Sequence, residues 1–484
     1  MIGFVIGRIL LSEAALMVLP VLVALLYGES VRPFLLPILA LVLVGGALGL
    51  PRPKRTALYA RDGFAVVALA WIFVSAFGAV PFVLSGDIPS MVDAFFETVS
   101  GFTTTGASIL REVEPLTRSG LFWRSFTHWV GGMGVLVFVM AVLPMSDGHG
   151  MHLLRAEVPG PTVGKLVSRM GDSAKILYGI YLAMTLVEIA LLLAGGMPLF
   201  DACVHAFGTA GTGGFSCRNL SVGAYQSAYF DVVIGVFMLL FGVNFNLYYF
   251  LLTRHFREVF RSEELRAYFL IVAAAVGAIA LDILHIYGSA LTSLRHAFFQ
   301  VSSIITTTGY ATVDFNAWPE FSRGVLVVLM FVGACAGSTG GGIKVARVVI
   351  LIKASYADMR RMLHPNAIST VRFEDKTVSD RQLRGVHLYL TVYLLVFTVS
   401  FLLLSLEQSD LVTTFTALAS CINNIGPGLE AVGPMGNFAD FSPFSKLLLS
   451  FDMLVGRLEI FPMLLLMAPS IWKRRLSGSR RSLF

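Results

Sequence analysis

The sequence predicts an all-α protein that crosses a membrane many times, with two N-terminal spans followed by four copies of one repeat. Of the 484 residues, 56% are hydrophobic and only 14% are charged, whereas a soluble domain carries about 25% charged residues. The apolar residues gather into segments of about 20, the length that crosses a bilayer. A glycine-containing polar motif recurs four times between these segments. The charges are too few to cover a soluble protein of this length, so a soluble enzyme is excluded.

Ten segments are long and apolar enough to be candidate spans. They cover residues 3–27, 33–50, 63–86, 120–144, 174–195, 228–253, 264–287, 322–352, 384–405 and 443–471. The first is long enough to span, and no small-residue cleavage site with a polar region follows it. We therefore expect it to remain as a helix rather than to act as a cleaved signal.

Lysine and arginine gather in every second connection between the spans. These connections are 51–61, 146–175, 254–266 and 353–384, and the tail 473–481 is also basic. Basic loops stay on the cytoplasmic side, so we expect these segments and both termini to be cytoplasmic. The net charge of +6 is then a signal of topology and lipid contact, and nucleic acid is not an expected partner. The four cysteines lack metal-site spacing, so no metal cofactor is indicated.

The other connections each hold about ten semi-apolar residues followed by a small-polar run. They cover 93–108, 201–216, 296–311 and 413–428, and they align without gaps on Gly106, Gly214, Gly309 and Gly426. The two residues before these glycines are Thr104 and Thr105, Thr212 and Gly213, Thr307 and Thr308, and Asn424 and Ile425. Four gapless copies, each between two spans, favour a fourfold repeat over ordinary loops with turn glycines.

Each half-span has a physical consequence. Ten helical residues cover about 15 Å, half of the hydrocarbon core, and non-helical backbone at that depth must be buried in protein or face water. Four such helices around one axis would point their partly negative C-termini at a common aqueous path, which favours a cation. The threonine–glycine runs would present backbone carbonyls to it, with glycine at positive φ. No carboxylate lies within these runs, so a weakly hydrated monovalent cation fits better than calcium or magnesium.

The eighth span is interrupted by a glycine-rich loop, residues 333–344. Its glycines are Gly333, Gly337, Gly340, Gly341 and Gly342. Each glycine costs a helix about 1 kcal/mol relative to alanine. We interpret the loop as a flexible plug beneath the carbonyl runs, with a passive kink as the alternative. It does not match the phosphate-binding GxxxxGK[ST] pattern. Lys344 would lie toward the cytoplasmic vestibule, where its charge opposes cation passage.

Arg457 lies about midway along the tenth span. A charge at that depth costs at least about 2.5–3.5 kcal/mol and marks a pathway or a buried pair. We favour a role beside the ion path. The alternative is a structural ion pair with a buried acid such as Glu188 or Asp452.

The four runs resemble those of a known family. The motifs TTTGAS, GTGGFS, TTTGYA and NNIGPG occur in that order and resemble the Trk/Ktr/HKT superfamily of K⁺ transporters, specifically its bacterial TrkH/TrkG branch. The resemblance covers essentially the whole chain and implies four M1–P–M2 units around a pseudo-fourfold pore. The expected divisions are 1–60 for the two extra helices, then repeats 61–150, 151–260, 261–380 with the intramembrane gating loop 333–344, and 381–484 with the basic tail.

The resemblance also implies a function. The protein is expected to carry K⁺ into the cell across the inner membrane, with the twelve aligned residues as selectivity filter and the glycine-rich loop, Lys344 and Arg457 as gate. Only the third repeat keeps a glycine–tyrosine pair, at Gly309 and Tyr310, so we expect selectivity less strict than that of a K⁺ channel. Implied partners are a second copy of the chain and cytosolic nucleotide-binding TrkA-type subunits.

Four other functions are weighed against K⁺ uptake through a pore, one of them a scaffold or sensor subunit that transports nothing. An ion-coupled symporter could use the same filter as a binding site. An alternating-access transporter of organic solutes is usually built from inverted repeats, which four same-direction half-spans do not resemble. A membrane enzyme is not expected, because the chain shows no HExxH or GxSxG motif and no cluster of carboxylates.

Overall fold

The computed structural model describes residues 2–50, 60–134, 170–364, 370–407 and 409–469. Within these parts the chain is mainly helical, and its strands β1 (Arg372–Phe373) and β2 (Lys376–Thr377) form one antiparallel hairpin. The expected basic tail 473–481 and most of the basic connections 51–61 and 146–175 lie outside the described residues.

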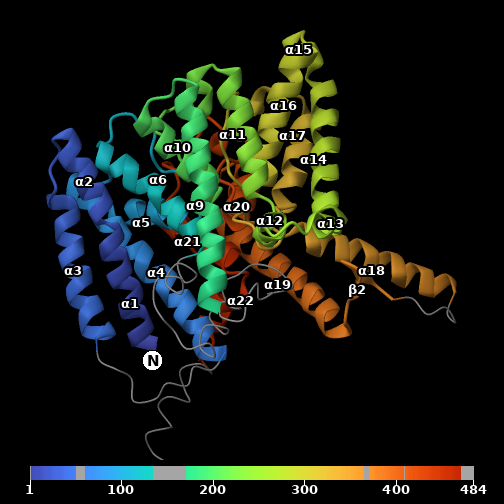
Figure 1. Cartoon of the computed structure of the whole chain (residues 1–484), viewed down its shortest axis with the longest axis horizontal. Helices are drawn as coiled ribbons and strands as arrows, with labels where there is room; N and C mark the ends of the chain where they lie inside the picture. The colour runs from blue at the N-terminus through green and yellow to red at the C-terminus, as the bar shows by residue number, and fades with distance from the viewer. Residues whose placement is uncertain (1, 51–59, 135–169, 365–369, 408, 470–484) are drawn as a thin grey trace, which may run out of the picture.

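The chain begins with helices α1 (Ile2–Leu16), α2 (Val18–Tyr27) and α3 (Arg32–Gly49). The first two together make one span and α3 makes the next, at one side of the helical body (Figure 1). Helices α1 and α3 approach closely because glycines face each other: a Cβ on Gly7 would overlap the backbone of Gly45 and Gly49. Small residues allow such contacts between membrane helices. The two N-terminal helices expected from the sequence are present.

Four units of helix, short helix and helix follow. The first helices are α4 (Ala60–Ser85), α9 (Met170–Ala194), α14 (Glu263–Asp282) and α19 (Asp380–Leu404). The short helices are α5 (Met91–Phe102), α10 (Leu199–Gly211), α16 (Ala290–Ile305) and α20 (Leu411–Asn423). The second helices are α6 (Arg118–Gly132), α11 (Ala228–Phe241), α17 (Glu320–Phe331) and α21 (Pro443–Arg457). The fold is the expected all-α membrane fold of four repeats.

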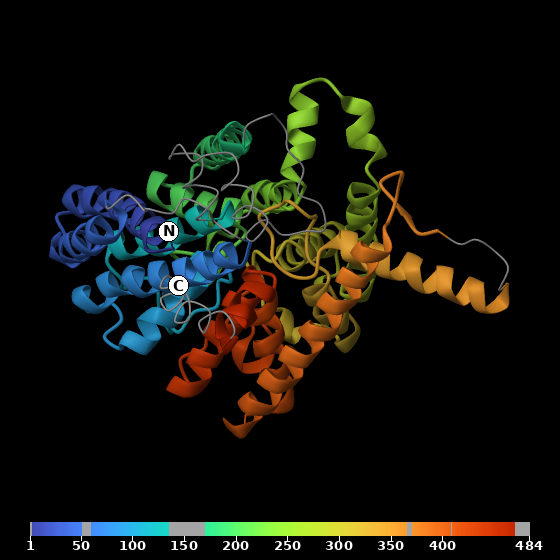
Figure 2. The ribbon, with the colours of Figure 1, turned by 90° about the horizontal axis from the view of Figure 1, so that it is seen from below.

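The remaining helices extend or connect these units. They are α12 (Phe245–Leu252), α13 (Phe256–Arg261), α15 (Leu284–Tyr287), α18 (Val345–Leu363) and α22 (Phe461–Met467). Single 3₁₀ turns cover Ser221–Tyr225, Phe315–Ala317, Ser405–Glu407 and Glu430–Val432. Helix α18 projects away from the body as a long arm, and the β1–β2 hairpin lies between it and α19 in the sequence (Figure 2).

Several expected spans are not continuous helices. Among the described residues, six helices are long and apolar enough to cross a membrane, and a seventh forms if α11 and α12, bent by 93°, count as one. The sequence predicts one break, in the eighth span, but the sixth and tenth spans also break, at 242–244 and 458–460. The last break lies beside two charged residues, Arg457 and Glu459, within an otherwise apolar segment, and Glu459 and Ile460 take positive φ values of 54° and 71°. The domain limits stay predictions.

Candidate functional site

Each short helix ends in the same backbone motif. After α5, the N–H of Thr104 donates to Gly101 O (3.1 Å) and that of Thr105 donates to Ser100 O (2.8 Å). These two bonds define a Schellman motif, which leaves one residue in the left-handed region. The same pair of bonds follows the other short helices. The left-handed residues are Thr104, Thr212, Thr307 and Asn424, with φ of 54°, 55°, 60° and 57°.

Three of these four left-handed residues are threonines, which rarely adopt positive φ. Glycine usually takes this place, and a β-branched residue with positive φ is a genuine outlier. Strain of this kind, of order 1–3 kcal/mol, persists only where the surroundings enforce it, often at functional sites. The sequence analysis expected left-handed backbone at the four glycines, which indeed have φ of 78°, 80°, 82° and 102°. It missed the second left-handed position two residues earlier.

The four aligned glycines meet in a closed ring. A Cβ on Gly106 would overlap the carbonyl oxygen of Gly213, the residue before the second glycine. The other three units repeat the relation. A Cβ on Gly214 would overlap Thr308 O, one on Gly309 would overlap Ile425 O, and one on Gly426 would lie 2.8 Å from Thr105 O. Each unit therefore faces the next, and the fourth faces the first. The structure brings the residues expected at the filter together around one axis.

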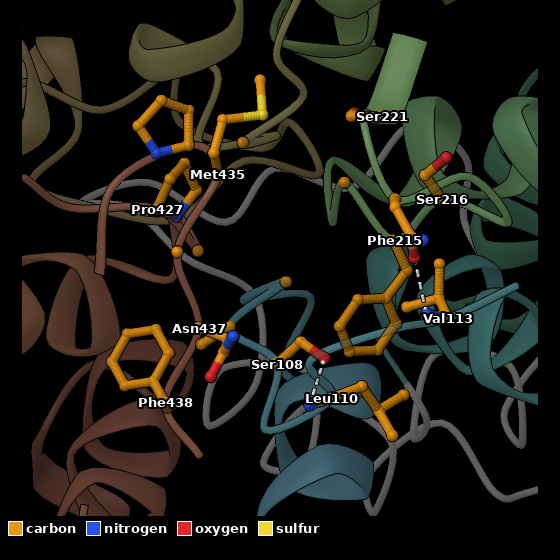
Figure 3. A pocket seen from close by; sticks show the side chains of 18 of the residues that line it. Ser108, Leu110, Val113, Phe215, Ser216, Ser221, Pro427, Met435, Asn437 and Phe438 are labelled. Atoms are coloured by element: carbon orange, nitrogen blue, oxygen red, sulfur yellow. Dashed lines mark hydrogen bonds between the residues drawn. The ribbon is translucent and has the colours of Figure 1, made fainter. Parts of the chain in front are cut away.

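A cavity of about 120 Å³ adjoins this ring and is lined by all four glycines. One wall comes from the stretch after the fourth filter run, including Pro427 and Met435, and Phe215 and Ser216 lie across the pocket from it (Figure 3). The ring thus opens onto a pocket assembled from several units.

Two aromatic side chains support the ring from behind. Nδ1 of His128, on α6, lies 2.7 Å from Gly101 O, and its Nε2 accepts the Phe215 N–H (3.3 Å). The hydroxyl of Tyr310 lies 3.0 Å from His205 O and 3.3 Å from Phe215 O. Both therefore hold the second filter run from a neighbouring unit. The sequence analysis missed His128, because only the fold brings α6 beside that run.

A buried ion pair links the first two filter runs. The Nε of Arg124 donates to Glu97 Oε1 (2.6 Å), and the two side chains are 4% and 0% exposed. Glu97 also accepts from Ser108 Oγ and from the Ile109 N–H, both at 2.9 Å. Arg124 donates to Ser216 O (3.1 Å). The ion pair thereby joins the segment that follows the first filter glycine, through Ser108 and Ile109, to the segment that follows the second, through Ser216. The sequence analysis did not single out either residue.

The glycine-rich loop lies against the other side of the filter runs. The Gly341 N–H donates to Thr307 Oγ1 (2.7 Å). A Cβ on Gly341 would lie 2.5 Å from Asn423 O, and one on Gly340 would lie 3.0 Å from Thr306 O. The loop therefore touches the third and fourth units at the ends of their short helices.

The break in the second unit accommodates this loop. Cys335 N–H donates to Gly242 O (3.0 Å) and Thr339 N–H to Phe241 O (3.4 Å), while Phe245 N–H donates to Gly337 O (3.0 Å). Helix breaks at membrane depth leave backbone groups that need partners within the protein. Here the break after α11 and the loop after α17 satisfy each other.

Two cations hold the glycine-rich loop. Lys344 is only 1% exposed, and its Nζ bonds Gly340 O and, at 3.2 Å, Gly341 O. It therefore folds back onto the loop rather than standing in an open vestibule. Arg457, the last residue of α21, donates to Thr339 O (2.8 Å).

Arg457 also reaches the first unit, where it donates to Gly131 O (2.5 Å) and Gly132 O (2.7 Å). Asp452, one of the acids considered as its partner, accepts instead from Ser400 Oγ (2.8 Å). Arg457 thus joins the loop of the third unit to the end of α6 through carbonyl oxygens, from a position in the fourth unit.

The chain is similar to known transport proteins. Residues 32–474 match the family model described as TrkH: Cation transport protein. The chain is 38% identical over 477 residues to the Trk system potassium uptake protein TrkH of Salmonella typhimurium, covering 97% of this chain and 98% of that one. It is 36% identical over 480 residues to TrkG of Escherichia coli K12, covering 98% of each. The crystal structure of the potassium transporter TrkH from Vibrio parahaemolyticus matches with a TM-score of 0.87 at 34% identity, over 97% of this chain and 99% of that one. The chain belongs to the TrkH family, which comprises cation transport proteins and not enzymes.

Proposed function

We propose that this protein carries K⁺ into the bacterial cell across the inner membrane, through the ring of filter runs. The observation that supports this most directly is the closed contact of each filter glycine with the next unit's carbonyl. The relatives named as potassium uptake proteins support the choice of ion.

The chemistry of the ring suits such an ion. Four helix C-termini point their partial negative charge toward it. The carbonyls before the glycines, of Thr105, Gly213, Thr308 and Ile425, can replace the hydration shell of a weakly hydrated cation. Larger side chains cannot replace the glycines without meeting those oxygens.

The glycine-rich loop is proposed as the gate. It lies directly against the filter runs and is held by Thr307 Oγ1, Lys344 and Arg457. The bonds with Thr307 Oγ1 and Arg457 join the loop to neighbouring units, so a displacement of the loop away from the filter must break them, whereas the Lys344 bonds lie within the loop. We further propose a homodimer with cytoplasmic termini, regulated by cytosolic TrkA-type nucleotide-binding subunits on the basic face.

Purified protein in a planar bilayer tests the transport proposal. Under a K⁺ gradient with symmetric H⁺ and Na⁺, the current should reverse at the K⁺ equilibrium potential. A reversal potential that moves when only the H⁺ gradient is changed supports the alternative, an ion-coupled symporter. A shift with the Na⁺ gradient alone is also expected from a pore with incomplete selectivity. Absence of any K⁺ current or uptake from well-folded protein contradicts both.

Gly341→Ala tests the gate. Its new Cβ would lie 2.5 Å from Asn423 O, so the loop must shift away from the filter, and Rb⁺ uptake into proteoliposomes without any partner should rise. Gly324→Ala is the matched control, because nothing lies within 4 Å of a Cβ at that position of α17. Equal uptake by both variants would contradict the gate.

A further inference from the structure

One buried carboxylate lies at the base of the glycine-rich loop. Oε1 of Glu264, in the first turn of α14, accepts the N–H of Ala336 (2.7 Å) and the N–H of Ala346 (3.1 Å). These two residues bracket most of the loop, and both they and Glu264 are buried. A single oxygen therefore brings the two ends of the loop together. Any motion that separates the ends must break at least one bond to a charged acceptor, and a buried N–H left without a partner is costly.

The position of Glu264 is fixed by a segment outside the helical bundle. Glu374, in the turn of the β1–β2 hairpin, accepts the N–H of Glu264 (3.1 Å) and the Oγ–H of Ser262 (2.9 Å) through its Oε1. Ser262 in turn caps α14 by accepting the Leu265 N–H (3.3 Å). Glu374 thus supplies a negative charge at the N-terminus of α14, which stabilises that turn.

Further contacts hold the hairpin in place. Arg261 Nε lies 2.8 Å from Asp375 Oδ2, and Lys353 on α18 donates to Arg372 O (2.9 Å) and pairs with Glu263. Glu374 and Asp375 both have positive φ, 50° and 57°, as two-residue hairpin turns of type I′ require. The hairpin is exposed beside α18, outside the helical spans (Figure 2).

We propose that Glu264 is the positioning residue that keeps the glycine-rich loop closed, and that the hairpin holds Glu264 in place through Glu374. The proposal rests on the proposed role of the loop as gate. A movement of the hairpin away from the bundle removes Glu374 from the first turn of α14. Glu264 then loses its fixed position, and the two ends of the loop are released without any contact to the filter.

Rb⁺ uptake into proteoliposomes without a partner tests this. Glu264→Gln keeps an acceptor oxygen but removes the charge that strengthens both bonds. We expect uptake to rise about fivefold, the factor for weakening one charge-assisted hydrogen bond by about 1 kcal/mol. The Rb⁺-to-Na⁺ uptake ratio should stay unchanged, which general damage to the filter would not allow. Glu258→Gln, an exposed acid on α13, is the control and should match the parent protein.

A double-mutant cycle tests the hairpin. Glu374→Gln should raise uptake by itself, and it should add nothing in the Glu264→Gln background. Effects that multiply would show that the hairpin does not act through Glu264 and would overturn that part of the proposal. If Glu264→Gln does not reach the membrane folded, Glu264→Asp, which keeps the charge but shortens the reach to the two N–H groups, takes its place with the same expectation.

The outcomes also separate this inference from the gate itself. Unchanged uptake in the Glu264 variant together with raised uptake in Gly341→Ala defeats the role of Glu264 and leaves the gate. Unchanged uptake in both defeats the gate and, with it, the inference.

Discussion

The filter ring repeats one backbone four times, whereas the region beneath it differs in every unit described. In the filter ring, all four short helices end in the same pair of hydrogen bonds, and left-handed residues occupy the same two positions after each of them. Below, α11 bends by 93° into α12, α17 is followed by the glycine-rich loop, and α21 breaks at 458–460. An ion held by four carbonyls requires equivalent oxygens, but a gate requires one element that moves against fixed neighbours.

The two regions also differ in what holds them. The filter runs are tied by buried side chains, chiefly the Glu97–Arg124 pair. The glycine-rich loop is tied by bonds to backbone carbonyls and amides from Arg457, Lys344 and Glu264. We expect changes in the first group to cost stability or selectivity, and changes in the second to alter flux.

The largest effect is expected at the buried ion pair. Glu97→Gln leaves Arg124 buried without its counter-ion, which costs about 3–5 kcal/mol. Thermal unfolding in detergent should show a large drop in stability. Asp440→Asn breaks the exposed pair with Arg111, whose side chains are 84% and 70% exposed, and should change stability by at most about 1 kcal/mol. Equal losses in the two variants would contradict the importance of burial.

Substitution of a filter glycine should come next. Gly214→Ser must place a side chain against Thr308 O, so the ring must distort. The K⁺-to-Na⁺ uptake ratio should fall by at least about tenfold, which corresponds to about 1.4 kcal/mol of lost discrimination. Gly196→Ser is the control for strain, because it has φ of 91° but nothing within 4 Å of an added Cβ. A fall in the ratio of the same size at Gly196 would refute the ring contact as the cause.

Within the ring, the four glycines should not be equally sensitive. The Cβ of Gly426 would lie 2.8 Å from its neighbouring carbonyl, while the other three would overlap theirs. Gly426→Ser should therefore retain the most selectivity when the four serine variants are compared by Rb⁺ and Na⁺ uptake. The reverse order would show that the ring is less regular than its backbone.

A moderate effect on flux is expected at Arg457. Arg457→Ala removes donors to Thr339 O, Gly131 O and Gly132 O, so partner-free Rb⁺ uptake should rise about fivefold. Arg457→Lys keeps the charge but cannot reach both Thr339 O and the α6 carbonyls. Its Rb⁺ uptake should therefore lie between that of the parent protein and that of Arg457→Ala. Normal uptake by the alanine variant at equal expression would remove Arg457 from the gate.

The smallest effect is expected at Thr104. Asparagine tolerates the left-handed region better than threonine, Asn424 already occupies the matching place, and Thr104 Oγ1 has no hydrogen-bond partner in the described structure. Thr104→Asn should keep uptake and change stability by less than about 1 kcal/mol. Thr307→Asn is the contrasting variant, because Thr307 Oγ1 accepts from Gly341, and it should alter flux.

The sequence predicts the ring well and the region beneath it only in part. The four filter runs are local and repeated, so an alignment of the chain with itself finds Gly106 and its three counterparts. His128, Arg124 and Glu264 act on segments far away in the sequence, and no local pattern marks them. The breaks at 242–244 and 458–460 lie within segments whose average hydropathy stays high, although the second includes Glu459, so hydropathy alone does not detect them. Five clustered glycines reveal the third break.

Single-channel recording of Gly214→Ser and Arg457→Ala, with K⁺ and Na⁺ on opposite sides, tests most directly whether selection and gating are separate. Gly214→Ser should shift the reversal potential away from the K⁺ potential with little change in open probability. Arg457→Ala should raise the open probability and leave the reversal potential where it is. If either variant changes both quantities together, the ring and the loop beneath it are not the separate devices described above.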